Sequence, residues 1–149
     1  MSGQTRPWHK PVALVVTALV AITILSIGLV SMYWLYWPYN PASISSIEIA
    51  SPVHSGGVAF STITGCKNVA TPTKVNRDLV GVGKTNGFYP YPEVESASPV
   101  RCATVIVPLV IPVLIPTGTY VLRDTYSTQV NPFRTITKTA TSNVFEIVP

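Results

Sequence analysis

A charge-free apolar run near the N-terminus restricts what this chain can fold into more than any other feature. Residues 12–32 read VALVVTALVAITILSIGLVSM, which is 21 consecutive residues without a charge. As a helix this run would be about 31 Å long, close to the hydrocarbon thickness of a bilayer. Core helices of soluble proteins are rarely apolar on every face over such a length. The run therefore predicts one transmembrane helix.

Aromatic residues follow this run directly. Residues 33–39 read YWLYWPY, and Trp and Tyr prefer the boundary between acyl chains and headgroups because their rings are apolar and carry one polar tip. A buried aromatic cluster in a soluble protein is the alternative, which the neighbouring apolar run disfavours. We expect a membrane-interface belt formed by Tyr33, Trp34, Tyr36, Trp37 and Tyr39.

The charges on either side of the run indicate its orientation. Arg6 and Lys10 precede it, whereas the next Lys or Arg is Lys67. The positive-inside rule then places the N-terminus in the cytoplasm and residues 41–149 in the periplasm or outside the cell. A cleaved signal peptide would have a shorter apolar region and a small-residue cleavage site. The first small residues after the aromatics are Ala42 and Ser43, which follow bulky aromatics and prolines, so we expect an uncleaved signal anchor.

After residue 40 the apolar residues recur with a period of two, which is typical of strands. Gly, Pro and Asn clusters separate the runs, and 14 prolines in 149 residues argue against a helical bundle. Six to eight short strands predict an all-β, antiparallel Ig-like β-sandwich after one N-terminal transmembrane helix. The expected parts are a cytoplasmic tail (1–11), the helix with its belt (12–39) and the sandwich (43–149). The runs are SISSIEIA, GVAFSTIT, VRCATVIV, GTYVLRDTY, FRTITKTA and NVFEIV.

Short motifs of this region resemble immunoglobulin-like or fibronectin-type domains. IEIASPVHSGG resembles the opening strand and first turn, IPTGTYVLRDTY the entry to the penultimate strand, and NVFEIV the last strand. The chain departs from true immunoglobulin domains, because no Trp lies between its cysteines and no Tyr lies two residues before Cys102. The anchor and the C-terminal stretch are also similar to small membrane-anchored proteins of phages and bacteria. These resemblances imply an architecture but no activity.

Both cysteines, Cys66 and Cys102, lie beyond the predicted helix. An even number of cysteines in an oxidising compartment favours one disulfide, and two buried thiols are the alternative. A disulfide closing a loop of about 37 residues would stabilise the fold by roughly 3–4 kcal/mol in the chain-entropy model.

The stretch VIVPLVIPVLIP, residues 105–116, has no polar side chain. It is too short and too rich in proline for a second membrane span. Prolines recur every fourth residue, so their missing N–H groups would fall on one edge of a strand, which indicates a protected edge strand. The alternative is an exposed apolar surface for a partner or the membrane. The candidate interaction residues are Val107, Leu109, Val110, Ile111, Val113, Leu114 and Ile115.

We find no catalytic, metal or cofactor site in the sequence. GVGKTNG lacks the first glycine of a phosphate loop, and its Asn86-Gly87 indicates a hairpin turn. His54 could form a triad with Asp78 or Asp124, but no nucleophile motif accompanies it. Glu93 and Glu95 fit a solvated loop better than a cation site, and two cysteines with one histidine make a thin zinc-ligand set.

Composition and charge narrow the function further. The net charge is only +4 and the Lys and Arg residues are scattered, which disfavours nucleic-acid binding. We therefore expect a non-enzymatic membrane protein whose sandwich binds a protein partner in a larger viral or envelope assembly. Self-association through the stripe formed by Ala13, Thr17 and Ala21 would give a homo-oligomer. The alternatives are a lysis factor or enzyme with an unrecognised site, and a lipid- or glycan-binding module using Phe88, Tyr89 and Tyr91.

Overall fold

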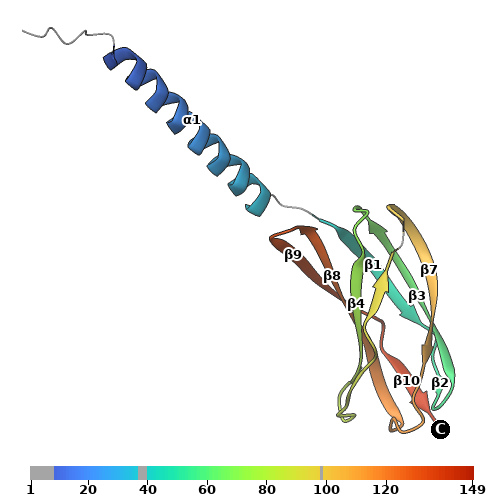
Figure 1. Ribbon diagram of the computed structural model, residues 1–149. Helices are drawn as coiled ribbons and strands as arrows, with labels where there is room; N and C mark the ends of the chain where they lie inside the picture. The colour runs from blue at the N-terminus through green and yellow to red at the C-terminus, as the bar shows by residue number, and fades with distance from the viewer. Residues whose placement is uncertain (1–8, 37–39, 98) are drawn as a thin grey trace, which may run out of the picture. The chain divides into compact units, whose positions relative to one another are not determined.

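The computed structural model describes residues 9–36, 40–97 and 99–149 (Figure 1). The chain divides into two compact units, Met1–Pro38 and Tyr39–Pro149. Within the described residues, the first unit is one helix and the second is a β-sandwich. The predicted fold class, a sandwich preceded by one apolar helix, is confirmed.

The helix α1 runs from His9 to Tyr36 and is apolar on every face. Its segment Pro11–Tyr36 has 26 residues, about 39 Å at the helical rise, so it is long enough to cross a membrane as an anchor or a signal sequence would. Hydroxyl groups inside the segment form hydrogen bonds with the backbone of the same helix. Thr17 donates to the carbonyl of Ala13 (2.8 Å), and Ser26 donates to that of Ile22 (2.8 Å). Trp37 and Tyr39 of the predicted belt lie outside the described residues.

Two sheets form the sandwich. The three-stranded sheet has the order β1-β3-β7, and all its pairs are antiparallel. The seven-stranded sheet has the order β2-β10-β8-β4-β5, with β6 also paired to β4 and β9 to β8. The strands are β1 (Ala42–Ile49), β2 (Val53–His54), β3 (Val58–Lys67), β4 (Thr73–Gly81), β5 (Phe88–Pro90), β6 (Val94–Ser96), β7 (Arg101–Val110), β8 (Gly118–Asn131), β9 (Arg134–Thr141) and β10 (Phe145–Val148).

The hydrophobic core fills the end of the sandwich at which β2 and β10 lie (Figure 1). Its centre consists of side chains with at most 1% exposure, and the Tyr120 hydroxyl donates to the carbonyl of Pro116 (2.7 Å) beside them. This bond resembles the tyrosine corner of Ig-like sandwiches, in which a hydroxyl bonds backbone a few residues upstream. The central residues are Leu79, Leu109, Ile111, Tyr120, Leu122, Phe145 and Ile147.

The sequence pattern missed β4, the central strand that pairs with β8. Its inward side chains are Thr73, Val75, Arg77 and Leu79, so polar residues interrupt the apolar alternation.

Two further expectations need correction. The hairpin β8–β9 comes before the last strand, so β8 is not the penultimate strand. Glu95 belongs to β6 rather than to a loop.

The Asn86-Gly87 pair does lie in a hairpin connection, between β4 and β5. The connection is six residues long, Val82 to Gly87, and the Gly81 amide donates to the Gly87 carbonyl at its base (2.9 Å). It is therefore not the two-residue turn that an Asn-Gly pair most often indicates.

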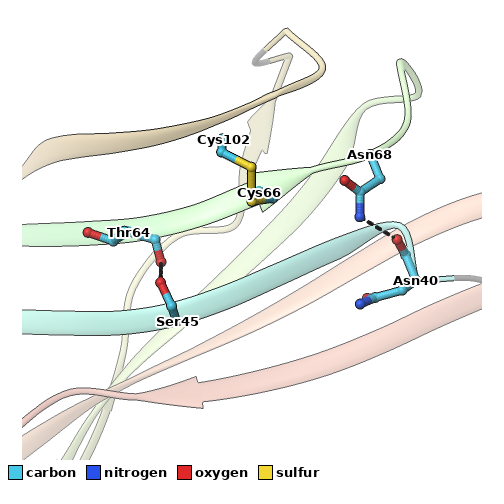
Figure 2. Close-up of a disulfide and its surroundings, with 6 residues drawn as sticks. All are labelled: Asn40, Ser45, Thr64, Cys66, Asn68 and Cys102. Carbon is cyan, nitrogen blue, oxygen red and sulfur yellow. Dashed lines mark hydrogen bonds between the residues drawn. A yellow bond between two sulfur atoms is a disulfide. The ribbon is translucent and has the colours of Figure 1, made fainter.

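A disulfide joins Cys66 to Cys102, as predicted (Figure 2). The two residues are directly opposite each other on β3 and β7, so the bond lies within one sheet. In immunoglobulin domains the conserved disulfide instead links the two sheets. Here the disulfide holds the alignment of two neighbouring strands.

Removing the disulfide should destabilise the domain more than removing the neighbouring hydrogen-bonded pair. Replacing both Cys66 and Cys102 by Ala should lower the free energy of unfolding by roughly 3–4 kcal/mol, because the 36-residue separation is no longer closed in the unfolded chain. Thr64 and Thr104 form the next pair on the same face (3.0 Å), and changing both to Ala should cost less than about 1 kcal/mol. Denaturant unfolding followed by circular dichroism measures both; equal losses would contradict the prediction.

Candidate binding surfaces of the sandwich

The inner face of the three-stranded sheet changes character along its length. Towards the core it presents Ile47, Ile63 and Leu109, whereas towards the opposite end it presents Ala42, Gly65 and Ala103. Gly65 cannot be replaced by a larger residue in this backbone, because a Cβ there would lie 2.6 Å from the carbonyl oxygen of Ser43. Small side chains leave the space between the two sheets unfilled at this end.

A cleft of about 450 Å³ opens there, and most of its lining is apolar. Such a volume is within the range of small-molecule sites. The three-stranded sheet forms one wall, while β4, β6 and the C-terminal half of β8 supply the other. Its apolar lining includes Ile44, Ile63, Val75, Val94, Val105 and Val107.

The second wall carries a buried polar cluster. The Arg77 guanidinium donates to both carboxylate oxygens of Asp124, each at 2.9 Å, and the Tyr126 hydroxyl donates to the same carboxylate at 3.0 Å. Asp124 is completely buried. The hydrogen bond to Asp124 raises the pKa of Arg77, and burial raises the pKa of the Tyr126 hydroxyl, with the Asp124 charge adding to that shift. Arg77 is thus a cation and Tyr126 a neutral donor at physiological pH.

Further along the same wall, the Thr73 and Thr128 hydroxyls bond each other at 2.9 Å. Within the described residues, every buried side-chain nitrogen and oxygen has a hydrogen-bond partner. The polar groups of this wall are therefore satisfied by the protein itself.

Two cations lie at the rim of the cleft. Lys67 and Arg101 are directly opposite each other at the ends of β3 and β7, next to the disulfide, and both line the cleft. The Lys67 ammonium donates to the carbonyl of Ser96 (3.2 Å), and Glu95 supplies the carboxylate of the lining. The rim consequently has a net positive charge.

The outer face of the three-stranded sheet is a second candidate surface. Val58, Phe60, Ile106 and Val110 point outwards from β3 and β7, and each is more than half exposed. The outer face of the opposite sheet differs, since β8 and β9 present Thr and Ser pairs there, such as Thr125 with Thr139 and Ser127 with Thr137. We call the four exposed residues of β3 and β7 the apolar face.

The predicted interaction segment is divided between core and surface. Leu109, Ile111 and Ile115 are buried in the core, so these three side chains cannot meet a partner. Val107 is half-buried and lines the cleft. Val110 on β7 and Val113 and Leu114 in the following loop are exposed. Alternation explains the division from Val107 to Ile111, where every second residue faces inwards, whereas Val113 and Leu114 lie in the loop after β7.

The proline pattern of the same segment fits an edge strand only in part. β7 is an edge of its sheet in the described part of the chain and contains Pro108. The strand ends at Val110, so Pro112 and Pro116 lie beyond it.

The residues considered for catalysis each have a different partner. Nδ1 of His54 lies 2.7 Å from an oxygen of Pro149, Asp78 pairs with Arg123 (3.1 Å), and Asp124 pairs with Arg77. Neither Asp78 nor Asp124 is therefore the partner of His54, as the triad considered from the sequence would require. Glu93 forms an exposed ion pair with Lys74 (3.2 Å). Among the residues that the structure describes, no three metal-ligating side chains converge.

Of the three aromatics considered for ligand stacking, Phe88 and Tyr89 belong to β5 rather than to a loop, and Tyr91 follows that strand. Phe88 is exposed, with the Arg123 guanidinium 5.6 Å from its ring centre. Tyr89 packs against Tyr120 at 6.3 Å between ring centres, and the Tyr91 hydroxyl donates to the Val110 carbonyl (2.9 Å). Burial raises the pKa of Tyr91 to about 12. Two of the three aromatics thus close the sandwich rather than form a stacking platform.

The comparisons with known proteins show no family for this chain. No family model and no curated protein matches this chain. The alkylpurine DNA glycosylase AlkC of Pseudomonas fluorescens, bound to DNA with an abasic site analog, is similar at 10% identity and a TM-score of 0.47, over 74% of this chain and 31% of that one. Because no family model and no curated protein matches, the resemblance to phage proteins stays a prediction.

Two smaller domains are similar as well. The CARDB domain of a Pyrococcus furiosus protein, in complex with di-metal ions, is similar at 15% identity and a TM-score of 0.43, over 74% of this chain and 91% of that one. The C-terminal domain of Wzt is similar at 10% identity and a TM-score of 0.47, over 76% of this chain and 77% of that one. These likenesses concern the β-sandwich fold alone.

The buried ion pair should matter far more to stability than the exposed one. Asp124→Asn leaves the Arg77 charge buried without a counter-charge and should cost about 3–5 kcal/mol of unfolding free energy. Glu93→Gln breaks the exposed Lys74 pair and should cost less than about 1 kcal/mol. Denaturant titrations of the two variants check this. Near-equal denaturation midpoints of the two variants would contradict a larger contribution of the Arg77–Asp124 pair to stability.

Proposed function

We propose that this chain is a non-enzymatic, single-pass membrane protein that presents its β-sandwich on the outer side of the membrane. There the sandwich binds another protein through the apolar face and the adjoining edge of β7. The observation that carries the binding proposal is the exposure of Val58, Phe60, Ile106 and Val110 on one uncovered sheet.

The helix and its flanks support the anchoring and the orientation. The segment Pro11–Tyr36 of α1 is apolar on every side and long enough to cross a membrane. Water would solvate such a helix poorly, whereas lipid removes its apolar side chains from water. Arg6 and Lys10 precede the apolar segment Pro11–Tyr36 and favour a cytoplasmic N-terminus, and the disulfide fits an oxidising compartment on the other side.

The apolar face supports binding to a protein rather than catalysis. Val58 pairs with Val110, and Phe60 with Pro108, in the β3–β7 register, so the exposed apolar side chains are neighbours across the two strands. Contiguous apolar patches on soluble domains commonly mark interaction sites. Among the described residues β7 is also an edge of its sheet, although Pro108 removes one backbone donor from that strand.

The orientation can be tested with the full-length chain in native membranes. Protease added from the extracytoplasmic side should digest residues 41–149, and protease added from the cytoplasmic side should leave them intact. Replacing Arg6 and Lys10 by Glu should reduce the fraction inserted this way, while Lys84→Glu in the sandwich should not. The mass of the mature chain distinguishes an anchor from a cleaved signal. Digestion from the cytoplasmic side, or loss of the N-terminal segment, would overturn the proposal.

The binding surface can be tested by site-specific crosslinking in the same membranes. A photoreactive amino acid at position 60 or 106 should link the chain to one defined protein, whereas the same amino acid at Thr137 on the opposite sheet should not. Phe60→Ser should lower the crosslinking yield from position 106 at least about tenfold. Equal yields from positions 60, 106 and 137 would contradict a specific surface. Links only between copies of this chain would replace the proposed partner with a homo-oligomer.

A further inference from the structure

The cation pair at the rim of the cleft is unfavourable unless an anion joins it. Lys67 and Arg101 are directly opposite each other on adjacent strands, where like charges destabilise a sheet. Among the described residues the ion pairs are Lys74–Glu93, Arg77–Asp124 and Arg123–Asp78, and none of them includes either rim cation. The Glu95 carboxylate also lines the cleft but forms none of these pairs, so the lining retains a net positive charge that is complementary to an anionic group.

The interior of the cleft suits a ligand group of different chemistry from the group that its rim suits. Its walls are mostly apolar, and the polar groups on the β4 and β8 wall, Arg77, Asp124 and Tyr126, already bond one another. A sugar or a peptide buried there would lose its hydrogen bonds to water without gaining partners. An unbranched hydrocarbon chain has no such groups to satisfy and gains from leaving water.

Few residues separate the cleft from the predicted membrane span in the sequence. Ala42 lines it, and only six peptide links join Ala42 to Tyr36 at the end of α1. Six links span at most about 22 Å when fully extended. If α1 spans the bilayer, membrane lipid is within reach of the cleft.

We propose that the cleft binds one acyl chain of an anionic membrane lipid, whose phosphate lies between Lys67 and Arg101. This inference rests on the proposed membrane anchoring. The ligand is a membrane phospholipid with a net negative headgroup, and the apolar cleft and the basic rim recognise its two ends. The Arg77, Asp124 and Tyr126 side chains of the second wall bond one another, so they need no polar partner from the acyl chain.

Photolabelling of the full-length protein tests the proposal. The protein is placed in nanodiscs of phosphatidylcholine that contain a little phosphatidylglycerol with a photoreactive acyl chain, and the labelled peptides are mapped by mass spectrometry. Label should appear in residues 11–36, which reports membrane insertion, and in residues 101–107 on the cleft side of β7. Phosphatidylcholine with the same photoreactive chain should label the second site several-fold less.

Paired variants separate the cleft from the rim. Ala103→Leu fills the cleft and should reduce labelling of the sandwich about tenfold, because it displaces roughly two methylene groups of the ligand. Thr104→Leu is the matched control on the outer face and should change nothing. Val105→Phe covers the mouth from a side chain that is 45% exposed, so it tests the cleft again at little risk to folding. Lys67→Gln with Arg101→Gln should abolish the preference for phosphatidylglycerol, unlike Lys74→Gln with Lys84→Gln.

Each result decides a different statement. Label confined to residues 11–36 would overturn the lipid cleft and leave the membrane anchor in place. Absence of label from both regions would overturn the anchor and the cleft together. Equal labelling by the two lipids would overturn the role of the rim cations, and unchanged labelling in Ala103→Leu and Val105→Phe would place the lipid outside the cleft.

Discussion

The register between β3 and β7 is the constraint on which both candidate surfaces depend. It aligns Cys66 with Cys102, and the disulfide prevents the two strands from slipping past each other. In this register Ala59, Ser61 and Ile63 face the core while Val58 and Phe60 face outwards. A slip of one residue would exchange the two faces of a strand. The apolar face and the small-residue lining of the cleft are therefore two consequences of one alignment.

The same alignment explains why the sandwich is closed at one end and open at the other. Large side chains meet between the sheets where Leu79, Leu109 and Phe145 pack, and the Tyr91 hydroxyl ties β7 to the neighbouring connection. At the opposite end the inner positions of β3 and β7 hold Gly65 and Ala103, and the facing wall is polar but internally satisfied. At that end the disulfide restricts the unfolded chain, and the Arg77–Asp124 pair leaves neither charge buried without a partner.

Much of the fold could be predicted from local patterns, and the surfaces could not. The strands SISSIEIA, GVAFSTIT and NVFEIV show their alternation directly, whereas β4 was missed because Arg77 and Thr73 take inward positions. Leu109, Ile111 and Ile115 resemble their exposed neighbours in composition, so only the packing separates core from surface. The cleft was invisible for a related reason, since Ala42, Gly65 and Ala103 are far apart in the chain and only strand pairing brings them together.

The sequence by itself determined the two-part design of this protein. A 21-residue apolar run needs no long-range contact to specify a helix suited to lipid, and period-two runs between turn residues specify strands. The tertiary structure decided which side of each strand is buried, that the cysteines bridge neighbouring strands, and that two cations share one rim. These properties depend on register and on sheet packing, which arise between residues distant in the chain and leave no local pattern to read.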